Sequence, residues 1–220
     1  MSIALVTGAN RGIGLSLCRL LKKRGATVVA ACRKSSPDLE ELGVQVEVGV
    51  DVASDESVRA LAKRMEGTRL DLLVNNAGIM ERHSLDSQVL DSMRRQFEVN
   101  AIGPMRVTAA LIQFLQPGAK IAIITSRMGS IADNASGGSY GYRMSKAAVN
   151  MAGVSLARDL SSRQIAVALI HPGFVKTELT GNRGEVSADD AAVGVLARID
   201  ALTLGTSGGF WHANGERLPW

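Results

Sequence analysis

Short apolar segments alternate with amphipathic segments along the whole chain. β-Branched and apolar runs predict strands over residues 3–7, 27–31, 45–48, 70–74, 120–125, 165–170 and 209–212. Between them, apolar residues spaced three and four apart predict helices over residues 12–24, 55–65, 85–101, 105–115, 142–160 and 188–201. Because parallel strands need helical crossovers, this order predicts an α/β fold: a doubly wound, mostly parallel sheet of about seven strands in three α/β/α layers.

The composition is that of a globular chain. Its 220 residues are 46% hydrophobic and 4% aromatic, and no linker or repeat divides them, so we expect a single domain over residues 1–220. The formal net charge of +4 comes from interspersed acids and bases. Without a run of Lys and Arg, the chain is not expected to bind nucleic acid.

The sequence also limits where the protein is expected to work. No apolar run reaches the ~18 residues of a membrane span, and the first strand leaves no room for a leader, so we expect no membrane insertion. Cys18 and Cys32 lack motif spacing and fit reduced core thiols, which favours the cytoplasm. Neither a cluster with metal-ligand spacing nor a Gly-x-Ser-x-Gly elbow occurs, so metal and hydrolase chemistry are not expected.

A glycine-rich loop directly follows the first predicted strand and opens the first helix. Its glycines allow a tight turn and close approach of the backbone to a pyrophosphate, which the helix N-terminus attracts. A glycine pattern alone also fits an ordinary strand-to-helix turn, but the strand before it and the helix after it favour a dinucleotide. The loop residues expected to bind are Gly8, Asn10, Arg11, Gly12, Ile13 and Gly14.

The end of the second predicted strand bears on which nicotinamide cofactor is bound. An NAD enzyme places an acid there, whereas this chain has Arg33 and Lys34 with no carboxylate before Asp38. Arg33 could bind a 2′-phosphate through charge-assisted hydrogen bonds, and Arg11 could approach from the other side. The alternative is two solvated surface arginines. We therefore expect NADP(H) to be preferred over NAD(H).

Further candidates lie where other predicted strands end, so all should meet at one edge of the sheet. Asp51 and Val52 could contact the adenine, although Asp51 competes with Ser54 as a helix N-cap. Small residues after the fourth strand would admit the cofactor, and the Asn side chains there could tie strand ends together. These residues are Asn75, Asn76, Ala77 and Gly78.

Tyr142 and Lys146 are four residues apart, so a helix would place a phenol and an ammonium on one face. At ~5 Å and an effective dielectric of about 20, Lys146 would favour the phenolate by ~3 kcal/mol, roughly two pKa units. We therefore expect Lys146 to bring the Tyr142 pKa from ~10 toward working pH. Tyr140 would lie on another face. A simple surface pair is the alternative.

Ser126 and Asn100 are the other candidate catalytic residues. Ser126 follows the fifth predicted strand, where its hydroxyl could hydrogen-bond a substrate oxygen, although a serine there is usually a cap. Asn100 interrupts an apolar helix shortly before Gly103 and Pro104, which predicts a kink whose freed carbonyl binds water.

Together these motifs, with Pro172 and Gly173 after the sixth strand, resemble the short-chain dehydrogenase/reductase family along nearly the whole chain. The stretches 125–130, 137–143 and 215–220 are similar to its C-factor-like and sniffer-like carbonyl reductase branch. The resemblance implies a Rossmann fold, Tyr142 as the general acid or base, a proton relay through Lys146 to water at Asn100, and Thr177 as the carboxamide ligand. It further implies cofactor contacts from Tyr142, Lys146, Pro172, Gly173 and Val175.

The resemblance implies an NADP(H)-dependent oxidoreductase that transfers a hydride between nicotinamide and a small carbonyl or alcohol substrate. The alternative is an NADP(H)-binding signalling or sensor protein of the C-factor type with little turnover. A homodimer is expected through helices 105–115 and 142–160, although burial within one chain would give the same apolar pattern.

Two departures from the family bear on the substrate. The interval between Ser126 and Tyr142 is longer than usual, and the stretch after Thr177 is short, so the substrate wall is expected to be altered. Arg127 and Arg143 flank the catalytic residues; they could favour an anionic substrate, but structural or solvated roles are favoured. His171 is expected to be structural.

Overall fold

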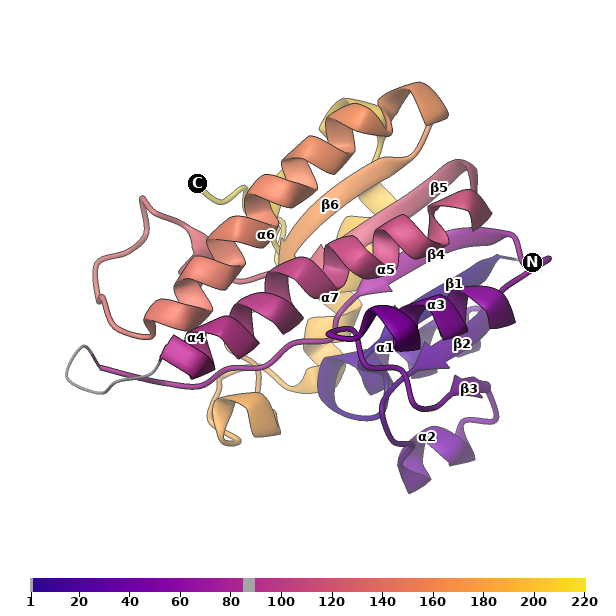
Figure 1. Cartoon of the computed structure of the whole chain (residues 1–220). Helices are drawn as coiled ribbons and strands as arrows, with labels where there is room; N and C mark the ends of the chain where they lie inside the picture. The colour runs from indigo at the N-terminus through magenta and orange to yellow at the C-terminus, as the bar shows by residue number, and fades with distance from the viewer. Residues whose placement is uncertain (1, 85–89) are drawn as a thin grey trace.

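Seven parallel strands form one sheet in the order β3-β2-β1-β4-β5-β6-β7. The structure is a computed structural model that describes residues 2–84 and 90–220 (Figure 1). The order reverses between β1 and β4, the point at which doubly wound sheets bind ligands. The strands are β1 Ile3–Thr7, β2 Thr27–Ala31, β3 Gln45–Glu47, β4 Leu70–Asn75, β5 Leu115–Ile124, β6 Ala166–His171 and β7 Phe210–His212.

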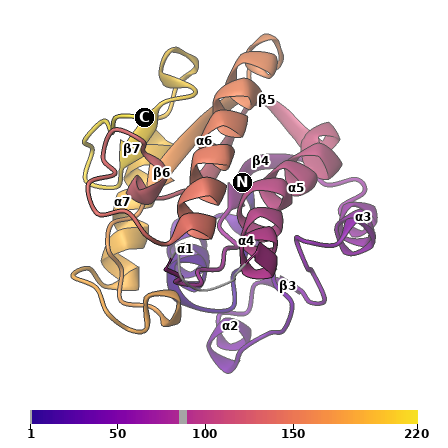
Figure 2. The same ribbon diagram turned by 60° about the vertical axis from the view of Figure 1, so that its left-hand side comes forward.

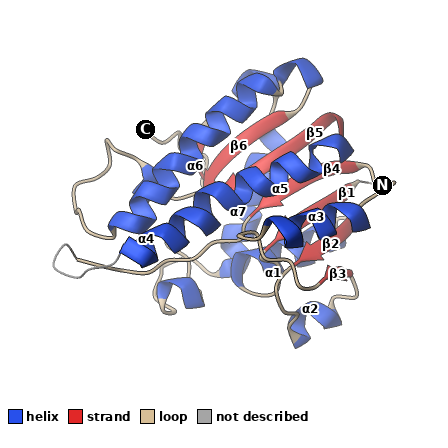
Figure 3. Cartoon of the chain, viewed as in Figure 1, coloured by secondary structure: helices blue, strands red, loops and turns tan. Residues whose placement is uncertain are grey.

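Helices cover both faces of the sheet (Figures 2 and 3). One face packs against α1 and α7, and the other against α3, α5 and α6, with α4 continuing into α5 along the same side. The α-helices are α1 Gly12–Lys23, α2 Pro37–Glu41, α3 Asp55–Arg64, α4 Leu90–Phe97, α5 Gly103–Leu111, α6 Tyr140–Asp159 and α7 Ala188–Ala201.

Each face of the sheet has its own apolar core, because successive strand side chains point to opposite faces. In β1, Leu5 joins the core under α3, α5 and α6, whereas Ala4 and Val6 join the core under α1 and α7. All three are at most 1% exposed. A strand buried on both faces reads as a continuous apolar run, which is why the strands were recognisable from sequence.

The predicted fold class is confirmed, and most elements lie within a few residues of their expected positions. The short helix α2 was not predicted; it begins after Ser36, whose hydroxyl accepts a hydrogen bond from the Leu39 backbone N–H, with Pro37 in its first turn. β5 begins at Leu115 rather than 120, because the chain pairs with Leu70 before Pro117 and Gly118 and shifts register afterwards.

The helix expected over 85–101 differs most from its prediction. Its first five residues lie outside the described part of the chain, and α4 passes after Phe97 into a π-helical turn, η1 Glu98–Ile102, which leads directly into α5. The kink expected at Asn100 therefore takes the form of a π turn. Such turns lose the regular i→i−4 pairing and are frequent at functional sites.

Within residues 2–84 and 90–220, no helix has the length and apolar character needed to cross a membrane. Over the same ranges, no group of three or more His, Cys, Asp or Glu side chains is placed to hold a metal ion.

Candidate active site

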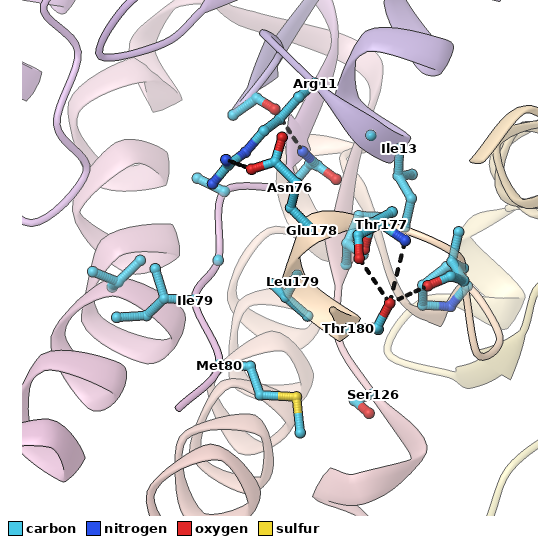
Figure 4. Close-up of a pocket in the computed structure, with 18 of the residues that line it drawn as sticks. Arg11, Ile13, Asn76, Ile79, Met80, Ser126, Thr177, Glu178, Leu179 and Thr180 are labelled. Carbon is cyan, nitrogen blue, oxygen red and sulfur yellow. Dashed lines mark hydrogen bonds and ion pairs between the residues drawn. The ribbon is translucent and has the colours of Figure 1, made fainter. Parts of the chain in front are cut away.

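A cleft of about 1000 Å³ opens at the carboxyl ends of the strands. Its walls come from the segments that follow β1 to β6, together with one face of α6. Figure 4 shows Arg11 and Ile13, the segment from Asn76 to Met80, and the turn from Thr177 to Thr180 around this hollow, with Ser126 at the lower edge of the view. The convergence expected from the sequence therefore exists in space.

The glycine-rich loop is packed tightly against the end of β4. Gly8 has a φ of +66°, and a Cβ there would lie 2.8 Å from the Ala77 Cα. A Cβ on Gly14 would lie 2.3 Å from the Gly8 carbonyl oxygen. Both contacts are with backbone atoms, which cannot move aside cheaply. Gly14 therefore packs inside the loop and is not part of the cleft lining, and its contact with the cofactor remains a prediction.

The N-terminus of α1 is left available to an anion. Arg11 is the N-cap residue, but its side chain makes no capping hydrogen bond, and the first turn of the helix contains no acidic residue. The first backbone N–H groups of a helix carry a partial positive charge and lack intrahelical partners. With the glycine loop beside it, this end of α1 fits a phosphate group.

Side-chain hydrogen bonds connect the ends of β1 and β4, as expected from the asparagines in the sequence. The Asn76 amide donates to the carbonyls of Thr7 and Gly8 at 2.9 and 3.1 Å, and the Thr7 hydroxyl accepts from the backbone N–H groups of Asn76 and Ala77 at 3.0 and 3.1 Å. Asn75 donates to the Thr108 hydroxyl at 3.0 Å and so fixes β4 to α5. These bonds hold the switch point of the sheet rigid.

Arg33, Asp51 and Val52 line the cleft beside the glycine loop, where the sequence placed the adenosine. Asp51 Oδ1 accepts from the Ala53 N–H at 2.9 Å, while Ser54 caps α3. Within the described residues Arg33 has no ion-pair partner. Its exposed guanidinium is therefore available to a ligand.

The Arg11 side chain was expected to approach a 2′-phosphate, but in the structure it has a partner within the chain. It forms an ion pair with Glu178, on the turn η5 Glu178–Thr180 that follows β6, so the pair bridges the glycine loop and the opposite wall of the cleft (Figure 4). No motif in the sequence indicated Glu178 as the partner of Arg11. Because both side chains are more than half exposed, the pair contributes little to stability.

Tyr142 and Lys146 lie on the buried face of α6 and both line the cleft. Their side chains are adjacent: the Lys146 Nζ lies 5.7 Å from the centre of the Tyr142 ring and donates to the Ile124 carbonyl at 2.9 Å. Ser126, at the end of β5, shares a side-chain hydrogen bond with Tyr142 and accepts from the Met128 N–H at 3.1 Å. Ser126 and Lys146 therefore both lie beside Tyr142.

The net shift of the Tyr142 pKa is opposite to the expected one in this state of the protein. Burial raises the pKa of Tyr142 to about 12, and the hydrogen bond with Ser126 only partly opposes it. Burial lowers the pKa of Lys146 to about 8. Sequence-based reasoning counted the attraction between the two charges but not the cost of removing each from water. At neutral pH the phenol is therefore protonated and poised to donate.

Asn100 does not line the cleft but is hydrogen-bonded to Ile79, which does. Its side-chain oxygen accepts from the Ile79 N–H at 2.9 Å, and its amide donates to the Ile79 carbonyl at 2.8 Å and to the Ser145 hydroxyl at 3.0 Å. The residue therefore clamps the segment after β4 to α6. The expected water relay remains a prediction.

The segment after β6 forms the wall opposite the glycine loop. Pro172, Gly173, Val175 and Thr177 all line the cleft. A Cβ on Gly12 would lie 3.3 Å from the Thr177 Cγ2, so the two segments nearly touch. His171 also lines the cleft; burial, followed by the positive charges around it, lowers its pKa to about 3, so its ring is neutral.

Arg127 and Arg143 are structural, the role favoured from sequence. Arg127 pairs with Asp133 at 3.2 Å and Glu216 at 3.0 Å, which ties the long loop after β5 to the C-terminal segment. Arg143 donates to the carbonyls of Gly137 and Gly138, both at 3.2 Å, and to the Ser136 hydroxyl at 2.8 Å. The residues that lengthen this loop, 129–139, do not themselves line the cleft.

Several residues that line the cleft were not predicted from the sequence, although they come shortly after predicted motifs. Met80 and Arg82 follow the predicted Asn76–Gly78 stretch, and Glu178 follows Thr177. The signal was available, because loops that leave the carboxyl ends of neighbouring strands line the same crevice. Apart from Gly14, Asn75 and Asn100, every predicted site residue lines the cleft.

Comparisons with known proteins agree with this geometry. The family profile described as short chain dehydrogenase matches residues 2–187. The chain is 46% identical over its full length, and over the full length of the relative, to the 1-hydroxy-2-glutathionyl-2-methyl-3-butene dehydrogenase of Rhodococcus sp. (strain AD45). It is 42% identical to the C-signal of Myxococcus xanthus, over 74% of this chain and all of that protein.

Among solved structures, the NADPH-bound carbonyl reductase from chicken fatty liver superposes with a TM-score of 0.90 at 30% identity, covering all of both chains. The resemblance to the branch that contains C-factor-like proteins and carbonyl reductases is thereby confirmed.

The buried lysine predicts an unusual pH dependence of stability. Between the lowered Lys146 pKa of about 8 and the ordinary lysine pKa of 10.5, the unfolded chain binds more protons than the folded one, so raising the pH through this window stabilises the fold by about 3 kcal/mol. Lys146→Met should lack this rise in the free energy of unfolding, measured by urea denaturation at pH 7.5 to 10.5.

The matched control is Lys23→Met, which replaces an exposed lysine at the end of α1 and should keep the wild-type profile. The lowered pKa of Lys146 would be contradicted if the difference in free energy of unfolding between wild type and Lys146→Met stayed constant over this pH range.

Proposed function

The chain belongs to the short-chain dehydrogenase family, and we propose that this oxidoreductase uses NADP(H) to interconvert a small carbonyl compound and its alcohol. The observation that carries the proposal is the Ser126, Tyr142 and Lys146 group on one wall of a cleft whose other end fits a dinucleotide. A proton donor beside a nucleotide cradle is what carbonyl reduction requires.

The cleft fits NADP(H) through three features. The uncapped N-terminus of α1 and the glycine loop would hold the pyrophosphate. Arg33 would hold the 2′-phosphate, because it is exposed, lines the cleft and has no ion-pair partner within the described residues. Asp51 and Val52 would contact the adenine. When bound, the nicotinamide supplies or accepts the hydride.

The catalytic side chains have separable roles. Tyr142, held neutral by burial, would donate its proton to the substrate oxygen during reduction. Ser126 would orient that oxygen and stabilise its developing charge. The Lys146 ammonium would stabilise the phenolate left on Tyr142. Water at the π turn could return the proton through Lys146.

The Rhodococcus relative suggests one candidate substrate. Its name specifies a dehydrogenase of an alcohol with a glutathionyl group on the neighbouring carbon. Because the identity is 46% and covers both chains completely, we propose a thioether alcohol of this kind, or the corresponding aldehyde, as a candidate substrate.

A binding protein with little turnover is the second candidate. The similarity to the C-signal protein, 42% over all of that protein's length, favours it. Tight NADP(H) binding with no turnover across a broad panel of carbonyls and thioether alcohols, together with a stable protein partner, would support this alternative.

We also propose a homodimer through α5 and α6. On α6, Met144 and Met151 are 54% and 70% exposed and lie seven residues apart, so they share one outward face. Exposed methionines of this kind are typical of a surface covered by a second chain.

Replacing the proton donor tests the proposed chemistry. Tyr142→Phe should lower kcat for aldehyde reduction by about 10²–10⁴-fold, since the ring is kept and only the transferable proton is lost. The absorbance at 340 nm measures the effect, as NADPH oxidation with aldehydes and ketones and as NADP⁺ reduction with thioether alcohols.

Tyr140→Phe is the matched control, because Tyr140 begins the same helix but does not line the cleft. It should keep wild-type turnover, and both variants should retain NADPH affinity by fluorescence titration. Equal turnover in wild type and Tyr142→Phe would remove Tyr142 from its assigned role.

Replacing Arg33 tests the cofactor preference. Arg33→Gln should weaken NADP⁺ binding about tenfold or more, because it removes charge-assisted hydrogen bonds to the 2′-phosphate, and should leave NAD⁺ binding nearly unchanged. Thermal shifts at several nucleotide concentrations report both affinities. Arg69→Gln, at an exposed position before β4, is the control. A larger thermal shift of the wild type with NAD⁺ than with NADP⁺ would refute the preference.

A charge on the outward face of α6 tests the dimer. Met151→Glu should convert the dimer to a species with the mass of one 23.2 kDa chain, because a carboxylate buried in an apolar interface is costly. Light scattering at micromolar concentration measures this. Val193→Glu, at a 52% exposed position on α7, should remain dimeric. A monomeric wild type would contradict the proposal.

A further inference from the structure

The side chains that line the cleft include more basic than acidic groups. Two carboxylate side chains, Asp51 and Glu178, belong to its described lining, and Glu178 is already paired with Arg11. The basic lining residues are Arg11, Arg33, Lys34, Arg82, Arg127, Lys146 and Lys176. Arg33 and Lys34 lie at the proposed adenosine end, so they do not account for the cations elsewhere.

At the catalytic end the arginines are not equivalent. Arg127 is neutralised by Asp133 and Glu216, and Arg143 is held by loop carbonyls and is not part of the lining. Arg82 lines the cleft, and within the described residues its guanidinium has no ion pair and no hydrogen bond. It is therefore the arginine at this end whose charge is available to a ligand.

The backbone that carries Arg82 is anchored on both sides. Before it, the Glu81 N–H donates to Gln96 at 3.0 Å and the Glu81 carboxylate pairs with Arg95 at 2.8 Å. After it, the His83 ring contacts the Ser92 hydroxyl at 2.7 Å and the His83 carbonyl accepts from the Ser139 N–H at 3.2 Å. The neighbouring carboxylate is thus engaged by α4, while Arg82 faces the cleft.

The same anchors place Arg82 near the reacting groups. Ser139 immediately precedes α6, whose third residue is Tyr142. On the other side, Met80 is two residues before Arg82 and lines the same cleft as Ser126. A substrate whose oxygen contacts Ser126 and Tyr142 would extend from there toward the mouth of the cleft, where Arg82 is exposed.

We propose that Arg82 determines substrate specificity by binding a carboxylate of the substrate, remote from its carbonyl or alcohol group. The inference rests on the proposed oxidoreductase function and adds the substrate class, a hydroxy or oxo compound that carries an anionic group. Guanidinium binds a carboxylate through two parallel hydrogen bonds, which an ammonium does not reproduce.

The test compares aldehyde acids with their own methyl esters. NADPH-dependent reduction of 3- and 4-formylbenzoate, 4-formylcinnamate and the three methyl esters gives kcat/KM for pairs that differ only in charge. The wild type should prefer at least one acid over its ester. For that acid, Arg82→Gln should lower kcat/KM about tenfold through KM, with kcat and ester kinetics unchanged. Arg82→Lys should retain part of the preference.

Two control variants separate Arg82 from other cations. Arg94→Gln, on α4 and outside the cleft lining, should keep the wild-type preference. Lys176→Gln removes a further lining cation that lies outside the proposed adenosine end and has no ion pair within the described residues. Loss of the preference in Lys176→Gln with retention in Arg82→Gln would overturn the assignment, as would acids and esters that are reduced equally well by the wild type. Reduction of neither acids nor esters would instead refute the oxidoreductase proposal on which this inference rests.

Discussion

The active site depends on burying one ammonium group at the end of the sheet. Lys146 is 5% exposed, and its Nζ has the Ile124 carbonyl as a partner. Gly129 makes room for the helix that carries it, because a Cβ there would lie 2.7 Å from the Lys146 backbone carbon. A side chain at Gly129 would displace α6 and, with it, Tyr142 one turn earlier. The glycines at this edge therefore serve the catalytic helix as well as the nucleotide.

The π turn in the helix before α5 has a structural role in the same arrangement. It contains Asn100, whose amide holds Ile79 by both of its backbone groups and also reaches Ser145 on α6. One side chain therefore sets the distance between the segment after β4 and the helix that carries Tyr142 and Lys146. A regular helix through Asn100 would change which way this amide points. The irregularity is compatible with stability because α4, η1 and α5 pack along the sheet on the same side as α6.

The order of elements and most of the site lining could be predicted from the sequence, because a two-faced parallel sheet imposes continuous apolar runs and because its functional loops leave one edge. Three features could not. The pairing of Arg11 with Glu178 joins residues 167 positions apart and follows no local pattern. The Tyr142 pKa depends on burial, which spacing on a helix does not reveal. The packing of Gly14 against the Gly8 carbonyl is set by the path of the loop, so the motif identified the glycine but not its neighbour.

The protonation states of the buried pair bear on the direction of the chemistry. In water, tyrosine and lysine titrate within about half a pKa unit of each other. Burial separates them, because it raises the pKa of Tyr142 to about 12 and lowers the pKa of Lys146 to about 8. At neutral pH the site therefore holds a phenol that has a proton to give and an ammonium that stabilises the phenolate as it forms. Oxidation of an alcohol would start from a phenolate, which burial disfavours unless a further positive charge enters the cleft. Burial therefore sets the resting protonation of this pair, which the spacing of the two residues along the helix does not reveal.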